Sequence, residues 1–324
     1  MNRRTFLLAA TAGAAALGAR PLIGAVPDPS LVLVTADTAS HVAVVHPATG
    51  KVVGRIDTPR LPRSIERVGQ TAVVAHSELG RITLIDQDDL TARALIGRLG
   101  EPRYTATHPD GRHAFVTDST LQEVVVIDVV RGRVVGRVAV GGPARHLTLD
   151  PSGRRLWAAL GTKAQRIAIV DVSDLRQPVV RGRLRPPFLA HDVVFSPSGD
   201  CVWVTSGDRG VIAIYDTATR RLVRRLDADA PPQHIVFSDA GRVAYVASGD
   251  DGTMRVHALD GRLLRTSRIP VGSFNVTGGA GHVVSPSLER GTLCILDRNG
   301  RVRRTVRVAP AAHDACLIRV GSRA

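Results

Sequence analysis

The sequence predicts an all-β fold, a seven-bladed β-propeller built from four-stranded antiparallel blades. Three observations predict it. A glycine-containing turn recurs every 40–46 residues, each repeat holds four short runs rich in β-branched residues, and seven such repeats fit into the chain. A period near 40 with four strands per repeat is typical of propeller blades.

Residues 186–227 represent one complete blade. The expected strands are residues 191–195, 201–205, 211–215 and 221–226, and Gly, Pro, Asp or Ser residues lie between them. Short apolar runs separated by such turn residues are typical of antiparallel hairpins. The other blades follow the same order of strands.

Two turn positions recur through the chain. The turn between the first and second strands carries a glycine at Gly69, Gly111, Gly153, Gly199, Gly241 and Gly281. An acidic residue ends most third strands, at Asp86, Asp128, Asp171, Asp216, Asp260 and Asp297. Both positions are expected at tight corners, where these residue types are favoured.

The number of blades follows from counting strand starts. First strands are expected near Ser64, Tyr104, His146, His191, His234, Phe274 and His313. The remaining three strands of each blade are expected to begin near Leu31, Thr71, His113, Arg155, Cys201, Val243 and His282. The first set of three strands lacks a first strand, and residues 313–320 lack partners, so the C-terminal strand is predicted to complete the first blade and remove open sheet edges.

Residues 1–25 are predicted to be a twin-arginine signal peptide. Arg3 and Arg4 precede an Ala/Gly-rich apolar segment that is too short for a transmembrane helix, and Ala25 offers a small-residue cleavage site. An ordinary secretory signal is the alternative. Residues 26–324 are then expected to form one propeller domain, exported to the periplasm as a monomer with no membrane span.

The charge of the chain indicates no nucleic-acid partner. Its 43 basic residues exceed 29 acidic ones, but only Lys51 and Lys163 are lysines and the arginines spread over turns and outer strands. Aromatic residues make up 3% of the chain, whereas a single-stranded nucleic-acid site needs stacking aromatics along a focused basic stripe. A protein or small-molecule ligand on the loop face is the expected partner.

Three cysteines, Cys201, Cys294 and Cys316, lie in predicted strands. The chain has no C-x-x-C and no C-x-x-C-H motif, so neither a thioredoxin-like pair nor covalent c-type haem is expected. Buried free thiols are the favoured interpretation, and a disulfide between Cys294 and Cys316 stays open.

Histidines at the first-strand starts form the most specific chemical pattern. His146, His191, His234 and His313 occupy this position in four of seven blades, and Asp192 and Asp314 directly follow two of them. Converging imidazoles are ligands for copper, zinc or iron, and a carboxylate serves as a further ligand or fixes a tautomer. Counting back from the turn places Asp192, not His191, at the register of His146. The alternative is that these histidines cap strand starts without any ligand.

Four further residues join this predicted site. His76, in a loop between second and third strands, is a candidate fifth histidine. Arg63, Arg103 and Tyr104 precede or begin first strands on the same face, where they are candidates for holding an anionic cofactor or ligand. Solvated rim residues are the alternative for these three.

The repeats resemble the YVTN β-propeller repeat. The segments 109–117 (P-D-G-R-H-A-F-V-T) and 124–128 (V-V-V-I-D) match its pattern, and Gly142-Pro143 matches its strand-start pair. The resemblance covers residues 30–320, fades near Gly69 and Gly281, and identifies the chain as a YncE-like exported propeller. It implies a fold more than a reaction. Related rings include quinoprotein amine dehydrogenase subunits, the haem domain of cytochrome-type nitrite reductases, and nitrous oxide reductase with its histidine-bound copper.

Two functions follow as hypotheses. The first is a non-catalytic periplasmic binding or scaffold propeller that uses its loop face and central channel. The second is a protein that binds copper, zinc or a haem-type cofactor through the histidines, as an oxidoreductase or a metallochaperone.

Overall fold

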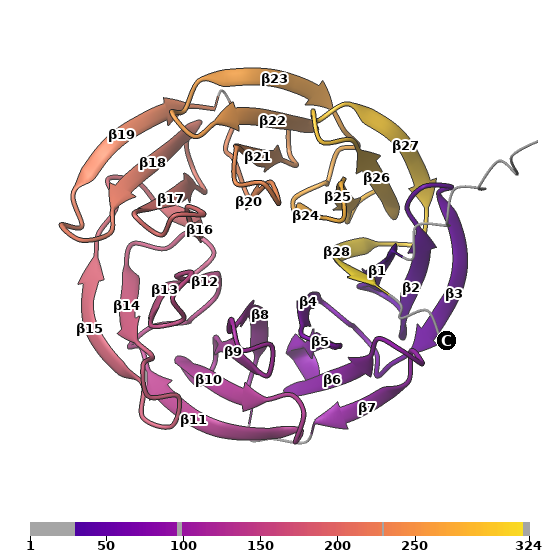
Figure 1. Cartoon of the computed structure of the whole chain (residues 1–324), viewed down its shortest axis with the longest axis horizontal. Helices are drawn as coiled ribbons and strands as arrows, with labels where there is room; N and C mark the ends of the chain where they lie inside the picture. The colour runs from indigo at the N-terminus through magenta and orange to yellow at the C-terminus, as the bar shows by residue number, and fades with distance from the viewer. Residues whose placement is uncertain (1–29, 96–98, 229, 320–324) are drawn as a thin grey trace, which may run out of the picture.

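Seven four-stranded antiparallel sheets surround a central channel in the computed structural model, which describes residues 30–95, 99–228 and 230–319 (Figure 1). The predicted seven-bladed propeller is confirmed. The predicted signal peptide, residues 1–25, lies outside the described residues. Among the described residues, the one helical segment is the short 3-10 turn η1 (Ser77–Leu79).

Every blade contributes one strand to each of four concentric rings (Figure 1). The innermost strands are β4 (Ser64–Val68), β8 (Pro102–Thr107), β12 (Leu147–Leu149), β16 (Ala190–Phe195), β20 (Ile235–Phe237), β24 (Thr277–Gly279) and β28 (Ala312–Arg319). The second strands are β1 (Ser30–Ala36), β5 (Thr71–His76), β9 (His113–Asp118), β13 (Arg155–Ala159), β17 (Cys201–Ser206), β21 (Val243–Ser248) and β25 (His282–Ser287). The third strands are β2 (His41–His46), β6 (Arg81–Asp86), β10 (Glu123–Asp128), β14 (Ile167–Asp171), β18 (Val211–Asp216), β22 (Thr253–Ala258) and β26 (Thr292–Leu296). The outer strands are β3 (Lys51–Asp57), β7 (Ala92–Leu95), β11 (Arg133–Ala139), β15 (Val179–Leu184), β19 (Leu222–Asp227), β23 (Leu263–Arg268) and β27 (Val302–Arg307).

The first blade joins the two ends of the described chain. Blade 1 consists of β28, β1, β2 and β3, and blades 2–7 follow in chain order from β4. Strand β28 pairs antiparallel with β1, with Leu31 opposite Ile318 and Leu33 opposite Cys316. The predicted closure by the C-terminal strand is therefore confirmed, and β28 covers the inner edge of β1.

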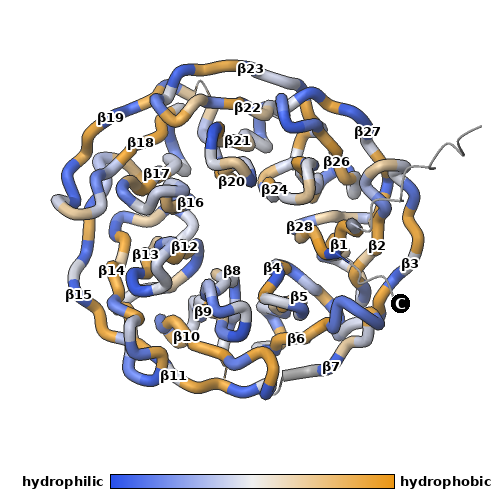
Figure 2. Tube along the Cα trace, in the orientation of Figure 1, coloured by the Kyte–Doolittle hydropathy of each residue, from blue (hydrophilic) through white to orange (hydrophobic). Residues whose placement is uncertain are grey.

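The hydrophobic core lies between the blades. The second and third strands are buried almost along their whole length, and their apolar side chains form seven clusters. Each cluster joins two neighbouring blades; Trp157 and Trp203, both nearly inaccessible to solvent, belong to two of them. Polar residues concentrate at the turns (Figure 2). Because neighbouring blades share each cluster, the blades bury their apolar faces only as a closed ring.

The recurring glycine and aspartate shape the corners. Gly69 and Gly111 adopt positive φ angles of 57° and 65°, and a Cβ atom on Gly69 would approach the Gly111 carbonyl oxygen to 2.1 Å. At third-strand ends, the carboxylates of Asp216 and Asp297 accept the backbone N–H groups of Thr219 and Asn299 at 2.7 and 2.9 Å. These corners need residues that permit left-handed backbone or accept local hydrogen bonds.

All three cysteines carry free thiols, so the Cys294–Cys316 disulfide left open by the sequence does not form. Cys294 and Cys316 are buried and Cys201 is partly buried. Within the described ranges, no helix has the length and apolar character needed to cross a membrane.

Candidate metal centre in the channel

One register of the innermost strands recurs in every blade, and its members from six blades line a hollow of the channel. The backbone N–H groups of Tyr104, Asp192 and Asp314 donate to threonine hydroxyls of the adjacent second strands at 2.9–3.1 Å, which places these residues at equivalent positions. We call this position the channel register. Its seven members are Ser64, Tyr104, His146, Asp192, His234, Asn275 and Asp314. The register confirms that Asp192, not His191, is equivalent to His146.

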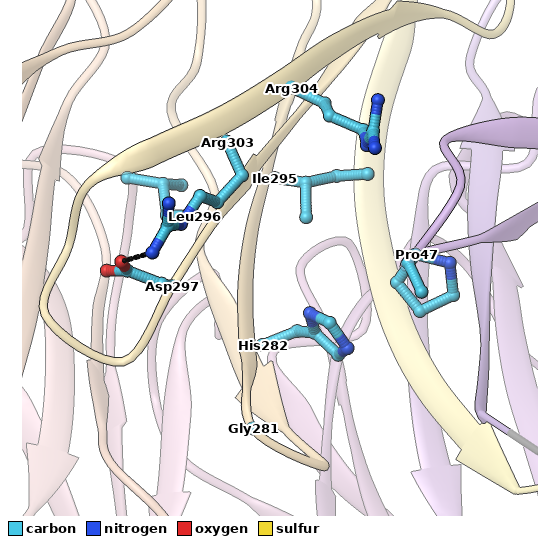
Figure 3. A pocket seen from close by; sticks show the side chains of 9 residues that line it. Pro47, Gly281, His282, Ile295, Leu296, Asp297, Arg303 and Arg304 are labelled. Carbon is cyan, nitrogen blue, oxygen red and sulfur yellow. Dashed lines mark ion pairs between the residues drawn. The ribbon is translucent and has the colours of Figure 1, made fainter. Parts of the chain in front are cut away.

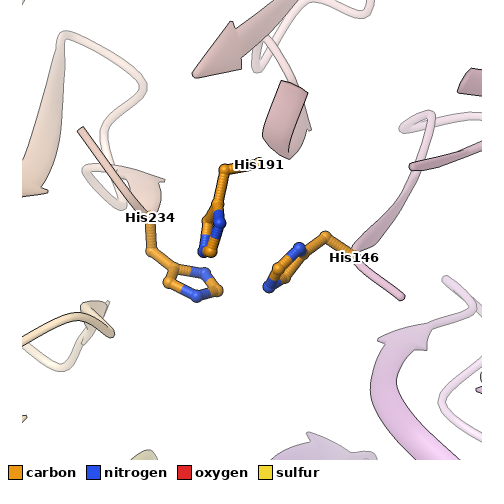
Figure 4. A group of neighbouring side chains, drawn as sticks. All are labelled: His146, His191 and His234. Atoms are coloured by element: carbon orange, nitrogen blue, oxygen red, sulfur yellow. The ribbon is translucent and has the colours of Figure 1, made fainter. Parts of the chain in front are cut away.

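Three histidines from three consecutive blades nevertheless come together. His146, His191 and His234 point their rings toward one another (Figure 4), and one nitrogen from each lies within 4.8 Å of the others. Their ring centroids are 4.4–5.3 Å apart. Nitrogens bound tetrahedrally to one ion at about 2.0–2.1 Å would lie about 3.4 Å apart. Side-chain rotations that bring the three nitrogens closer together would be needed for this histidine cluster to hold one ion.

A hydrogen bond fixes the tautomer of His191, and a carboxylate lies within ion-pair distance of His234. His191 Nδ1 lies 3.0 Å from the Thr162 carbonyl oxygen, which accepts only, so Nδ1 carries the proton. His234 Nδ1 lies 3.4 Å from Asp192 Oδ2. In His191 this arrangement leaves the Nε2 lone pair available for a metal.

His146 is the unusual member of the cluster. Its side chain is 1% exposed, and neither ring nitrogen has a hydrogen-bond partner. Burial, and next the neighbouring His191 and His234, hold the pKa of His146 well below its ordinary value. Burial, and next His234, lower the pKa of His191 to about 3. Both rings are therefore neutral at pH 7, the form that binds a metal.

Asp192 holds the cluster between blades 5 and 6. Its Oδ1 accepts the N–H of Val193 at 2.8 Å, and its Oδ2 accepts the N–H of Ile235 in the next blade at 3.1 Å. These bonds aim Oδ2 at His234 as well. Asp192 thus contacts His234 and is not itself part of the three-nitrogen group.

The other predicted histidines lie outside the cluster. His313 is buried, and its Nδ1 lies 2.9 Å from the carbonyl oxygen of Arg63. Burial, and next the charge of Arg63, hold the pKa of His313 well below its ordinary value. Both ring nitrogens of His76 are occupied, by the carbonyl oxygen of Arg60 at 3.1 Å and by Thr83 Oγ1 at 2.9 Å. His313 and His76 therefore connect strands and loops.

Asp314 ties blade 1 to blade 2 as Asp192 ties blades 5 and 6. Its Oδ2 accepts the N–H of Ile65 at 3.1 Å and its Oδ1 accepts the N–H of Ala315 at 2.9 Å. Asp314 is not part of the three-nitrogen group. Burial is the main cause that raises the pKa of Asp314 to about 6. With Glu66, it lines a channel hollow of about 180 Å³ that also reaches His146 and His234.

Glu66 is a titratable group that sequence inspection did not single out. Burial, and next the charge of Asp314, raise its pKa from 4.5 to about 8. The folded chain therefore keeps a proton that the unfolded chain releases, and the free energy of unfolding should fall as pH rises from about 4.5 to about 8. We expect Glu66→Gln to reduce this fall by on the order of 1–3 kcal/mol, allowing for water in the channel. Denaturant unfolding at about pH 5 and about pH 8.5, with the exposed Glu289→Gln as control, measures the effect. An unchanged pH slope in Glu66→Gln would contradict it.

Arg63, Arg103 and Tyr104 lie beside the cluster. The Tyr104 ring centroid is 4.3 Å from that of His146, and burial raises the pKa of Tyr104 to about 12. Arg63 pairs with Asp37 at 3.2 Å, and Arg103 pairs with Glu101. Arg145, which sequence inspection did not select, follows Arg63 and Arg103 at the same position of the next blade, and its guanidinium carbon lies 5.9 Å from the Tyr104 ring centroid. The equivalent positions of Arg63, Arg103 and Arg145 in the sequence repeats could have identified Arg145 as a candidate.

A second depression lies away from the channel, between blades 7 and 1. Pro47, His282 and Arg304 line it together with the ion pair of Arg303 and Asp297, whose atoms are 2.8 Å apart (Figure 3). Its volume is about 460 Å³. Its lining does not include the convergent imidazoles of the channel, so the channel is the stronger candidate site.

Solved structures of similar shape share the propeller. Hydrazine synthase of Kuenenia stuttgartiensis is 17% identical, with a TM-score of 0.72, and the match covers 85% of this chain and 94% of that one. The dihydro-heme d1 dehydrogenase NirN, in complex with DHE, is 18% identical, with a TM-score of 0.63 and coverage of 91% and 66%. A functionally unknown protein from Desulfotomaculum acetoxidans is 13% identical, with a TM-score of 0.76 and coverage of 90% and 99%. At these identities the likeness concerns the fold.

The family comparison agrees with the architecture. No curated protein matches the chain. The model of the family described as "Lactonase, 7-bladed beta-propeller" matches residues 71–285, which is more than half of the sequence and runs from β5 to β25. The chain therefore belongs to this seven-bladed lactonase propeller family.

Proposed function

We propose that this protein is an exported, YncE-like binding propeller whose channel holds a transition-metal ion through His146, His191 and His234. The observation that carries the proposal is the buried His146 side chain, whose two nitrogens lack partners while two further imidazoles face it. Buried polar groups are normally hydrogen-bonded, so an unpartnered imidazole beside two other imidazoles favours a metal ligand.

The donor set favours zinc or copper. Three imidazoles suit both ions, and three protein ligands leave a fourth position for water or a bound molecule. That position is where a lactone carbonyl, the ligand class in the family's name, would meet the ion. The adjoining hollow of about 180 Å³ is below the roughly 300–1,000 Å³ of ordinary cofactor pockets, which favours an ion over a haem.

Periplasmic location and export by the twin-arginine route remain part of this proposal. They rest on Arg3, Arg4 and the apolar segment that follows. This proposal combines the two hypotheses drawn from the sequence, a binding propeller and a metal-binding protein, because the metal ion is the ligand that the channel binds.

The experiment compares two aspartates at equivalent positions. Both Asp192 and Asp314 accept a backbone N–H from the next blade, but only Asp192 contacts a histidine of the cluster. We expect the full chain, purified without added histidines or chelator, to bind one Zn²⁺ or Co²⁺ per molecule. Asp192→Asn should weaken that binding about 10–100-fold, because a carboxylate behind a ligating histidine raises its basicity and fixes its ring.

Asp314→Asn is the matched control and should bind metal as the wild type does. Calorimetric titration and the visible spectrum of the Co²⁺ form measure both variants. A well-folded wild-type protein that binds neither zinc, copper nor cobalt would refute the proposal. Equal losses in both variants would assign the effect of Asp192 to blade packing.

A further inference from the structure

Three arginines lie at one position of three consecutive blades. Arg63, Arg103 and Arg145 each directly precede the channel register of blades 2, 3 and 4, and each is partly buried. The Nε atoms of all three are shielded from solvent and have no hydrogen-bond partner. A buried donor without an acceptor is unfavourable. Three such donors at one level of the channel indicate an acceptor that is not part of the chain.

The charges of this arginine cluster are incompletely balanced. Arg63 pairs with Asp37 and Arg103 with Glu101. Within residues 30–95, 99–228 and 230–319, no carboxylate lies within ion-pair distance of Arg145, and no hydrogen bond engages its side chain. Burial, and next the charge of Arg145, lower the pKa of Arg103. The cluster therefore holds cations close together with one positive charge in excess.

Among the described residues Arg145 forms no ion pair, and its guanidinium lies against an aromatic ring. Its guanidinium lies over the Tyr104 ring at 5.9 Å, and Tyr104 is itself 4.3 Å from His146. The carboxylates of Asp192 and Asp314 line the channel hollow together with Tyr104 and His146, but neither forms an ion pair with Arg145. Arg145 thus lies against the Tyr104 ring and has no carboxylate partner among the described residues.

We propose that Arg63, Arg103 and Arg145 form a binding site for a small oxyanion, a carboxylate or a phosphate, beside the histidine cluster. Guanidinium groups present paired N–H donors whose geometry matches the oxygens of both anions. Arg145 supplies the unbalanced charge, and the Nε–H groups of the other two supply further donors from neighbouring blades. Because every group in this site belongs to the chain, binding of the anion requires no metal.

The test uses the full chain after metal removal with a chelator and dialysis. Inorganic phosphate and succinate are titrated separately by calorimetry at constant ionic strength, with chloride as the background anion. We expect saturable binding of at least one of the two, and the stronger binder identifies the ligand as a phosphate or a carboxylate. Arg145→Gln should weaken binding at least tenfold, and Arg145→Lys should restore part of it, because a lysine keeps the charge without the paired donors. The exposed Arg221→Gln is the matched control and should bind as the wild type does.

The outcomes separate this proposal from the metal proposal. Anion binding by the metal-free protein that Arg145→Gln weakens supports the arginine site, whether or not the histidines bind metal. Anion binding that appears only after Zn²⁺ is added and is unchanged in Arg145→Gln overturns the arginine site, since the anion is then a ligand of the metal alone. Absence of phosphate and succinate binding to a folded metal-free chain also overturns it. Equal weakening in Arg145→Gln and Arg221→Gln overturns it as well, because the effect is then one of overall charge.

Discussion

Replacing His146 by leucine is expected to weaken metal binding more than 100-fold and to leave the metal-free protein at least as stable as the wild type. The loss of affinity follows because one of three ligands disappears, whereas removal of a group behind a ligand already costs about 10–100-fold. The stability follows because the imidazole is 1% exposed and has no hydrogen-bond partner. An unsatisfied buried polar group costs about 1–3 kcal/mol, and an apolar side chain of similar size avoids that cost. Zn²⁺ titration and urea unfolding of the metal-free protein measure the two effects.

This combination distinguishes a binding residue from a structural one. A histidine kept for architecture would lower the stability of the metal-free protein when replaced, and its replacement would not affect metal affinity. His41→Leu is the control, because His41 begins β2 in blade 1, away from the cluster. Wild-type metal affinity in His146→Leu, or a loss of several kcal/mol in its metal-free stability, would contradict the assignment.

Ending the chain at Pro310, before β28, is expected to abolish cooperative folding. The truncation removes the innermost strand of blade 1, whose buried Leu317 and Ile318 side chains contribute about 1.5–3 kcal/mol each. It also removes the six-residue pairing with β1 and the Asp314 contact with blade 2. Two of the seven hydrophobic clusters contain β28 residues. The combined loss approaches the whole stability of an ordinary domain, about 5–15 kcal/mol.

Circular dichroism and thermal unfolding of the truncated chain measure this effect. A chain ending at Arg319 keeps β28 entire and is the matched control. We expect a sharp unfolding transition for the control and a broad or absent one for the truncation at Pro310, together with aggregation through the exposed edge of β1. A sharp transition at the wild-type temperature in both chains would show that the ring does not depend on its closing strand.

Local sequence patterns were sufficient to determine the blades. Gly69 and Gly111 lie where the backbone is left-handed, and at Gly69 the neighbouring blade also approaches too closely for a side chain. Asp216 and Asp297 lie where a corner needs a short acceptor. Turn chemistry and the alternation of apolar residues act over a few residues, so a single sequence contains them. The C-terminal strand had no partners within its own repeat, so pairing with the first blade was the way for it to complete the ring.

Only the tertiary structure decided which side chains form the site. The pattern placed four histidines at strand starts, but His313 bonds to a backbone carbonyl, whereas His191 reaches the cluster although Asp192 occupies the channel register in its blade. Arg145 became a candidate anion-binding residue only when the structure showed its contact with the Tyr104 ring and, within the described residues, no ion pair with a carboxylate. The strand register determines the backbone position of a residue. The rotamer, the burial and the hydrogen-bond partners from other blades determine where its side chain lies. The sequence by itself therefore determined the seven-bladed ring, and the packing of blades 3–6 around the channel decided which side chains come together there.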